Sequence, residues 1–145
     1  MSEPLTRATD SNPVFPACPL FILVVEDHAE AAQNLALLLR FHGHEVLIAH
    51  DEAEALATLE IAQPDVILMD IGLPDSSGYE VARRLCVRLG RKPLLVAVTG
   101  YTHLREKSWL SGFDHHIEKP VDPNELAELL RRHAERVAAT AQPAR

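Results

Sequence analysis

The stretch Asp65-Val66-Ile67-Leu68-Met69-Asp70 decides the fold, because it joins an uninterrupted apolar run to an acid at its end. Four consecutive apolar residues without alternation are typical of a strand that is buried on both faces of a parallel sheet. Pro64 precedes this run, and the turn-rich segment from Ile71 to Gly78 carries the chain away from it. The sequence therefore predicts a central strand with Asp70 at its carboxyl end, where open α/β sheets bind their ligands.

Other apolar runs predict four further strands, which alternate with helices. We expect strands at residues 20–25, 45–49, 93–98 and 113–118, and helices at residues 28–42, 51–62, 77–89, 102–111 and 122–137. The pairs Asp51/Glu54 and Asp122/Glu125 are helix start signals, with a capping acid and a second acid three residues later. The alternation predicts one parallel sheet with helices on both faces.

Length and composition predict one folded domain. The chain has 145 residues, of which 47% are hydrophobic and 24% are charged, and this is enough for one core but too little for two ordinary domains. The proline-rich residues 1–19 are expected to form a flexible tail or linker. Residues 20–138 would then form the domain, and residues 139–145 a frayed end.

Charge and cysteine content restrict the partners and the compartment. A formal net charge of −7 argues against a nucleic-acid-binding surface, which needs an excess of Lys and Arg. No apolar run approaches membrane-spanning length and the N-terminus lacks the pattern of a signal peptide, so we expect a cytoplasmic protein without a membrane partner. Cys18 and Cys86 lack metal-ligand spacing, which favours free thiols in a reducing compartment.

Polar residues stand at the ends of four predicted strands and should meet at one edge of the sheet. In chain order they are Glu26 and Asp27, Asp70, Thr99 and Lys119. The carboxyl ends of parallel strands share one rim. Three carboxylates in one place repel one another unless a hard cation such as Mg²⁺ lies among them. An ammonium and a hydroxyl can bind further oxygens of a phosphoryl group, so the rim predicts a phosphoryl site.

The chain resembles the receiver domain of two-component response regulators. The residues that carry this resemblance are Glu26-Asp27, Asp70 with Leu73-Pro74 and Gly78, Thr99-Gly100, and Lys119-Pro120. It covers about residues 20–137. It implies a flavodoxin-like, doubly wound parallel sheet with five strands in the order 2-1-3-4-5 and five helices.

The resemblance implies that Asp70 accepts a phosphoryl group from a sensor histidine kinase or a histidine phosphotransfer protein. Mg²⁺ would be the cofactor, bound directly by Asp27, Asp70 and the backbone carbonyl of Gly72, and through water by Glu26. The product would be an acyl phosphate that the domain itself hydrolyses, so the protein would be a switch rather than a conventional enzyme. Residues at Gly72 and Tyr101, near the attacking water, would set its lifetime.

Lys119 and Thr99 complete the switch that the resemblance implies. Lys119 would contact the phosphoryl group and precede a cis bond to Pro120, and the Thr99 hydroxyl would turn toward the bound group. This movement would repack the face made by residues 102–111, the fifth strand and the last helix. That face would bind a downstream protein or a second copy of the chain.

One position departs from the family pattern. Where receiver domains usually have Tyr or Phe three residues before the lysine, this chain has His116. The ring either fills the same space by packing, or it reports phosphorylation and also titrates near neutral pH, which would make the output depend on pH. Tyr101, beside Thr99, is the alternative source of a moving ring.

Other functions fit only part of the pattern. An aspartyl-phosphate phosphohydrolase needs a second acid two residues after its nucleophile, where this chain has Gly72. A nucleotide-binding module needs a glycine-rich or Walker loop after the first strand, and the sequence has neither. A receiver-like module that acts only by docking would not need the complete set of acids, hydroxyl and lysine. The sequence leaves open a stand-alone receiver or one taken from a longer hybrid kinase.

The histidines do not form a predicted metal or phosphotransfer site. Zinc ligation by His115 and His116 is disfavoured because adjacent strand residues point to opposite faces. The pair His42 and His44 has no supporting cysteine or acid at ligand spacing. His28 is interpreted as a solvated residue at the start of a helix rather than as a phosphotransfer residue.

Overall fold

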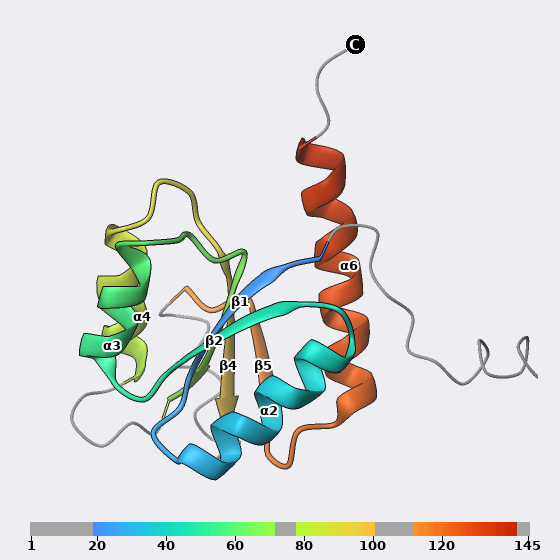
Figure 1. Cartoon of the computed structure of the whole chain (residues 1–145), viewed down its shortest axis with the longest axis horizontal. Helices are drawn as coiled ribbons and strands as arrows, with labels where there is room; N and C mark the ends of the chain where they lie inside the picture. The colour runs from blue at the N-terminus through green and yellow to red at the C-terminus, as the bar shows by residue number, and fades with distance from the viewer. Residues whose placement is uncertain (1–18, 72–77, 101–111, 142–145) are drawn as a thin grey trace, which may run out of the picture.

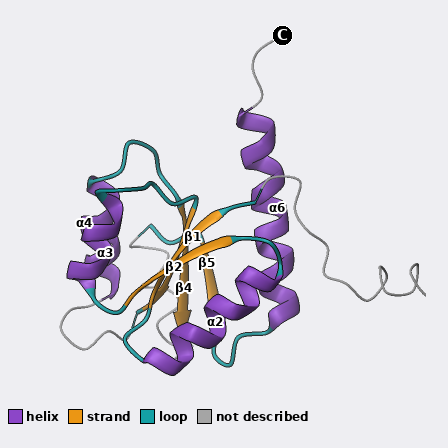
Figure 2. Cartoon of the chain, in the orientation of Figure 1, coloured by secondary structure: helices purple, strands orange, loops and turns teal. Residues whose placement is uncertain are grey.

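A computed structural model of the protein describes residues 19–71, 78–100 and 112–141, which form a parallel sheet between two layers of helices (Figures 1 and 2). The strands are β1 (Phe21–Val25), β2 (Glu45–Ala49), β3 (Val66–Asp70), β4 (Leu94–Thr99) and β5 (His115–Glu118). The helices of the described ranges are α2 (Ala29–Phe41), α3 (Glu52–Leu59), α4 (Gly78–Val87) and α6 (Pro123–Ala141).

The sheet has the predicted topology. Its strands follow the order β2-β1-β3-β4-β5, and each neighbouring pair is parallel. β3 lies in the centre, and all five of its residues are buried, as its unbroken apolar run predicts. Four of the five expected helices are present, and the helix expected at residues 102–111 lies outside the described residues.

Two hydrophobic cores cover the two faces of the sheet. The core under α2 and α6 includes Ile22, Val24, Leu68, Val96, Leu39 and Leu130. The core under α3 and α4 includes Leu23, Ile67, Met69, Leu95, Ala55 and Leu85. Figure 1 shows these two pairs of helices on opposite sides of the sheet. Successive residues of a strand point to opposite faces, so each central strand contributes side chains to both cores. Packing on both faces fixes the positions of the strand ends.

The predicted start signals of α3 and α6 are confirmed. Asp51 precedes α3, and its Oδ1 accepts a hydrogen bond of 2.9 Å from the backbone N–H of Glu54. Asp122 precedes α6, and its Oδ1 accepts one of 2.9 Å from the N–H of Asn124. These caps satisfy backbone donors that have no partner inside the first turn of a helix.

The last helix is longer than the expected range of 122–137. α6 runs from Pro123 to Ala141. Alanine has the highest helix propensity of all residues, and this end of the helix is rich in it. The last turns of α6 project beyond the sheet in Figure 1. No helix in the described ranges has the length and apolar character needed to cross a membrane.

Candidate functional site

The ends of β1, β3, β4 and β5 bring the predicted polar residues to one edge of the sheet. Glu26 and Asp27 directly follow β1, Asp70 ends β3, Thr99 ends β4, and Lys119 directly follows β5. Glu26, Asp70 and Thr99 are buried, with exposed fractions of 4%, 8% and 2%. Polar groups that are this strongly buried need partners, and they find them at this edge.

Lys119 links the acids of β1 and β3. Its Nζ lies 3.4 Å from Oδ2 of Asp70 and 3.4 Å from Oε1 of Glu26. The backbone N–H of Lys119 donates a 2.8 Å hydrogen bond to the carbonyl of Thr99, which places the lysine beside the end of β4. The bond between Lys119 and Pro120 is cis, as expected. The lysine side chain is 36% exposed, so its ammonium can also reach a group arriving from solvent.

The charges at this edge are not balanced. Burial, and then the nearby Asp70 carboxylate, raise the pKa of Glu26, and these effects exceed the opposing ones of the His28 N–H and Lys119. Burial alone would lower the pKa of Lys119, but the charges of Asp70 and Glu26 outweigh it and raise that pKa. One ammonium therefore faces three carboxylates, and the edge favours further positive charge.

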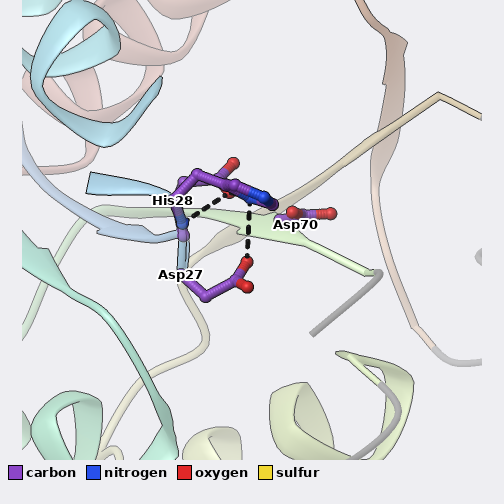
Figure 3. A group of neighbouring side chains, drawn as sticks. Asp27, His28 and Asp70 are labelled. Carbon is purple, nitrogen blue, oxygen red and sulfur yellow. Dashed lines mark hydrogen bonds and ion pairs between the residues drawn. The ribbon is translucent and has the colours of Figure 1, made fainter. Parts of the chain in front are cut away.

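The acids and a neighbouring histidine form a group that could hold a cation (Figure 3). Possible ligand atoms of Glu26, Asp27, His28 and Asp70 all lie within 4.8 Å of one another. Oδ1 of Asp27 is buried and receives no hydrogen bond from the described residues. The N-cap residue of α2 is His28, and its side chain makes no capping hydrogen bond. A buried carboxylate oxygen in this state fits a metal ligand, and this donor set suits a divalent cation.

Gly78 holds the start of α4 against the end of β3. A Cβ atom at this position would lie 2.5 Å from Cα of Ile71 and 3.1 Å from the carbonyl oxygen of Asp70. Real Cβ atoms do not approach backbone this closely, so only glycine fits without a shift. The glycine of the predicted motif therefore supports the backbone that carries Asp70.

Gly72, Tyr101 and His116 were also predicted to belong to the site, and the structure describes only His116. Gly72 and Tyr101 lie outside the described residues. His116 lies in β5 beside Ala97 of β4 and is half-buried. Its neighbour Ile117 belongs to the core under α2 and α6, so His116 faces the side of α3 and α4. His115 then points the other way, which agrees with the argument against a zinc site.

A groove of about 450 Å³ opens beside the acids, between α2 and the segment after β5. Glu26 and Lys119 line one part of it, and the apolar side chains include Leu35, Leu38 and Val121. The sequence did not predict this groove or the place of the His28 ring, because both depend on how α2 packs. The position of His28 directly after Asp27 was the only sequence signal for it.

Comparison with known protein families matches residues 22–131 to the response regulator receiver domain. The chain belongs to this family. Two solved receiver domains show the same fold over almost their whole length. The CheY-like receiver domain from Methanospirillum hungatei JF-1 is 32% identical, with a TM-score of 0.74 over 85% of this chain and 99% of that one.

The second solved structure is the receiver domain of the sensor histidine kinase PA1611 from Pseudomonas aeruginosa PAO1. It is 29% identical, with a TM-score of 0.71 over 81% of this chain and 98% of that one, and has a magnesium ion coordinated in its active site cleft. Among curated proteins, the transcriptional regulatory protein TrcR of Mycobacterium tuberculosis is 31% identical over 135 residues. That match covers 87% of this chain and 49% of TrcR, so the receiver chain spans about half the length of that regulator.

Membership of the family gives the acidic edge its general meaning. Receiver domains are phosphoacceptor switches of two-component signalling rather than conventional enzymes, and they bind Mg²⁺ at an acidic cluster. The acidic group of this receiver domain fits such an aspartate and metal site. Family membership also implies contact with a histidine kinase or a phosphotransfer protein.

Proposed function

We propose that residues 20–138 form a receiver domain in which Asp70 accepts a phosphoryl group from the phosphohistidine of a sensor histidine kinase or phosphotransfer protein. The observation that carries this assignment is the position of the Lys119 ammonium, 3.4 Å from an oxygen of both Asp70 and Glu26. An ammonium in this place can bind a phosphoryl oxygen as soon as the group reaches Asp70. The exchange is assigned to the cytoplasm, where a reducing environment suits the free thiol of Cys86.

Asp70 is the nucleophile of the proposed transfer. One of its carboxylate oxygens forms a bond to phosphorus while the bond between phosphorus and the imidazole nitrogen of the donor breaks. The released nitrogen takes a proton from water, and the product is an acyl phosphate. The Lys119 ammonium offsets charge on the phosphoryl oxygens during this step, and it is already in place before the donor arrives.

Glu26, Asp27, Asp70 and the backbone carbonyl of Gly72 are assigned to the Mg²⁺ site. When bound, Mg²⁺ offsets the charge of the carboxylates and of the phosphoryl oxygens. The burial of Glu26 and the absence of a hydrogen bond to Asp27 Oδ1 from the described residues support this assignment. Glu26 also accepts a 3.2 Å hydrogen bond from the backbone N–H of His28, which orients its carboxylate.

Thr99 is proposed to transmit the change. Its hydroxyl is buried at the end of β4, and its carbonyl holds the backbone of Lys119 at 2.8 Å. Binding of this hydroxyl to the new dianionic group would draw the chain after β4 toward Asp70. The ring of His116 or Tyr101 would follow, and the face made by residues 102–111, β5 and α6 would then bind a downstream protein or a second copy.

Hydrolysis is proposed to reset the domain without a separate enzyme. A water oxygen attacks phosphorus, the bond between phosphorus and the Asp70 oxygen breaks, and inorganic phosphate leaves. The aspartate is regenerated as a carboxylate. Residues at positions 72 and 101 are assigned the control of how fast this water reacts.

The groove between α2 and the segment after β5 is proposed to receive the phosphodonor. Its apolar side chains, among them Leu35 and Leu38, suit a helix that presents an apolar face. Its polar edge contains Glu26 and Lys119, so a phosphohistidine on that helix would arrive beside Asp70. The groove and the acidic group thus give the donor both a contact surface and a chemical target.

Incubation with Mg²⁺ and a small phosphoramidate donor, followed by intact mass measurement, tests the assignment. Wild type should gain one base-labile phosphoryl group, and Asp70→Asn should gain none. Asp51→Asn is the matched control, since it changes an exposed helix cap to an equally good one and should react like wild type. An adduct that persists in Asp70→Asn would refute the assignment.

A further inference from the structure

His28 lies against the acids of the proposed metal site rather than in open solvent alone. Its ring Nδ1 is 3.3 Å from Oε2 of Glu26 and 3.4 Å from Oδ1 of Asp27. Figure 3 shows the ring reaching from the backbone beside Asp27 toward Asp70. The side chain is 74% exposed, so the ring can adjust its angle without disturbing the core. The ring nitrogen therefore approaches the same oxygens that would surround a cation.

The imidazole changes the chemistry of this donor set. Ligand atoms of His28, Glu26, Asp27 and Asp70 lie within 4.8 Å of one another, so one ion could contact an atom of each. Mg²⁺ selects oxygen ligands and gains little from a nitrogen. Zn²⁺ and related first-row ions bind imidazole well, and mixed carboxylate and histidine sites are typical of them. A nitrogen at this position should therefore discriminate between the two classes of ion.

We propose that His28 is a nitrogen ligand of the cation site, and that it selectively strengthens the binding of borderline transition-metal ions, represented by Zn²⁺. This inference rests on the proposed function, because it uses the cation site assigned to Glu26, Asp27 and Asp70. The side chain of His28 does not cap α2, so no helix contact competes for its ring. Oδ1 of Asp27, which lacks a hydrogen bond from the described residues, lies 3.4 Å from Nδ1 of His28, so one ion could contact both atoms.

His28→Asn is the discriminating variant, because asparagine can still hydrogen-bond to Glu26 but is a much weaker ligand for Zn²⁺. His50→Asn is the matched control. His50 contacts Glu54 in the same way, through Nδ1 at 3.1 Å and its backbone N–H at 2.8 Å, but it lies outside the acidic group. Comparing the two separates a ligand of this site from zinc binding by histidines elsewhere on the surface.

Isothermal titration with Zn²⁺ and Mg²⁺ gives the first readout. His28→Asn should weaken Zn²⁺ binding at least tenfold and change the Mg²⁺ dissociation constant less than twofold, whereas His50→Asn should change neither. NMR of the histidine rings gives the second, because one equivalent of Zn²⁺ should shift the His28 signals first. Equal Zn²⁺ affinity in His28→Asn and wild type would overturn the proposal, as would unmoved His28 signals at one equivalent.

Failure of this inference can be distinguished from failure of the proposed function. If Asp70 is phosphorylated in Mg²⁺ but Zn²⁺ affinity does not depend on His28, only the role of His28 is wrong. If Asp27→Asn leaves the affinity for both ions unchanged, the cation site itself is misplaced, and both proposals fail. Loss of binding of both ions in Asp27→Asn supports the common site.

Discussion

The ammonium of Lys119 lies 3.4 Å from Oδ2 of Asp70, although 49 residues separate the two in the sequence. β4 lies between the strands that carry them, and its last residue, Thr99, holds the backbone of Lys119. The contact is therefore a product of the strand order and does not arise from any local motif. It places a positive charge beside the Asp70 carboxylate and so prepares this carboxylate to accept an anionic group.

Removing this ammonium should slow phosphorylation without unfolding the domain. Lys119→Gln should react with a small phosphoramidate at a rate at least about tenfold below wild type, because the ammonium no longer shares with Mg²⁺ in offsetting the charge on the phosphoryl oxygens. The rate is followed by intact mass. Lys92→Gln is the control, since Lys92 pairs with Asp114 at 2.7 Å away from this site. Equal rates in Lys119→Gln and wild type would show that the contact has no catalytic role.

Glu26 should make the metal-free domain less stable as pH rises. Its pKa in the folded protein is raised above the ordinary value of 4.5, first by burial and then by Asp70. The folded state thus binds more protons than the unfolded state above pH 4.5, and stability falls as pH rises through the folded pKa. In the presence of a chelator, Glu26→Gln should be more stable than wild type at pH 7, because glutamine carries no charge to be buried.

Urea denaturation from pH 4.5 to pH 7.5 measures this difference. The difference between Glu26→Gln and wild type should grow with pH, and Mg²⁺ should reduce it by stabilising wild type. Glu45→Gln, an exposed change at the start of β2, controls for the loss of one negative charge. If the difference in the free energy of unfolding between the two proteins stayed constant across this range, the pKa of Glu26 would not be raised in the folded protein.

Gly78 should tolerate no side chain. Gly78→Ala would place a Cβ 2.5 Å from Cα of Ile71, and moving this backbone should cost about 1–3 kcal/mol of unfolding free energy. Gly90→Ala is the control, because its Cβ would meet only the flexible side chain of Gln63 at 3.5 Å. Urea denaturation compares the two. If Gly78→Ala were as stable as Gly90→Ala, the close packing of α4 on the end of β3 would be wrong.

His44 should make the domain sensitive to acid. Its buried Nδ1 accepts a 3.1 Å hydrogen bond from the N–H of Leu20, and burial followed by the charge of His42 lowers its pKa from the ordinary 6.5. The unfolded state therefore binds more protons than the folded state below pH 6.5. The free energy of unfolding falls as the pH decreases from 6.5 toward the lower pKa of the folded protein. Burial also lowers the pKa of His133, so this residue adds a further loss of stability at acid pH.

His44→Asn keeps an acceptor for Leu20 but cannot titrate. Its thermal stability should fall less than that of wild type between pH 7 and pH 5.5, with the contribution of His133 still present. His44→Phe removes the acceptor and should cost about 1–3 kcal/mol at pH 7.5, since the buried Leu20 N–H is left unpaired. A His44→Asn variant with the same acid sensitivity as wild type would disprove the role of this histidine.

Much of the site could be predicted because it follows the ends of apolar runs. Asp70 and Thr99 stand at the ends of buried strands, and Lys119 directly follows the half-buried β5. Parallel strands place such residues on one rim. The strand order and the cis bond followed from the resemblance, and both are present. Local pattern and overall topology agree at these positions, which is why reasoning from sequence succeeds there.

Other features could not be predicted, because they depend on packing between distant elements. His28 is solvated at the start of a helix, as expected, since its side chain is 74% exposed. The contact of its ring with Glu26 was not predicted, because it depends on the way α2 leaves β1. The need for glycine at position 78 comes from the approach of α4 to Ile71. α6 extends to Ala141, beyond the expected end at residue 137, which agrees with the high helix propensity of the alanines in its last turns.

Chemical mapping of the phosphorylated carboxylate tests the central claim most directly. Borohydride reduces an acyl phosphate to an alcohol, so treatment of the phosphorylated protein should convert one aspartate to homoserine, which peptide mass measurement then locates. We predict homoserine at position 70, dependent on Mg²⁺ and absent without the phosphodonor. Homoserine at position 27, or a phosphorylated protein in which residue 70 remains aspartate, would contradict the account.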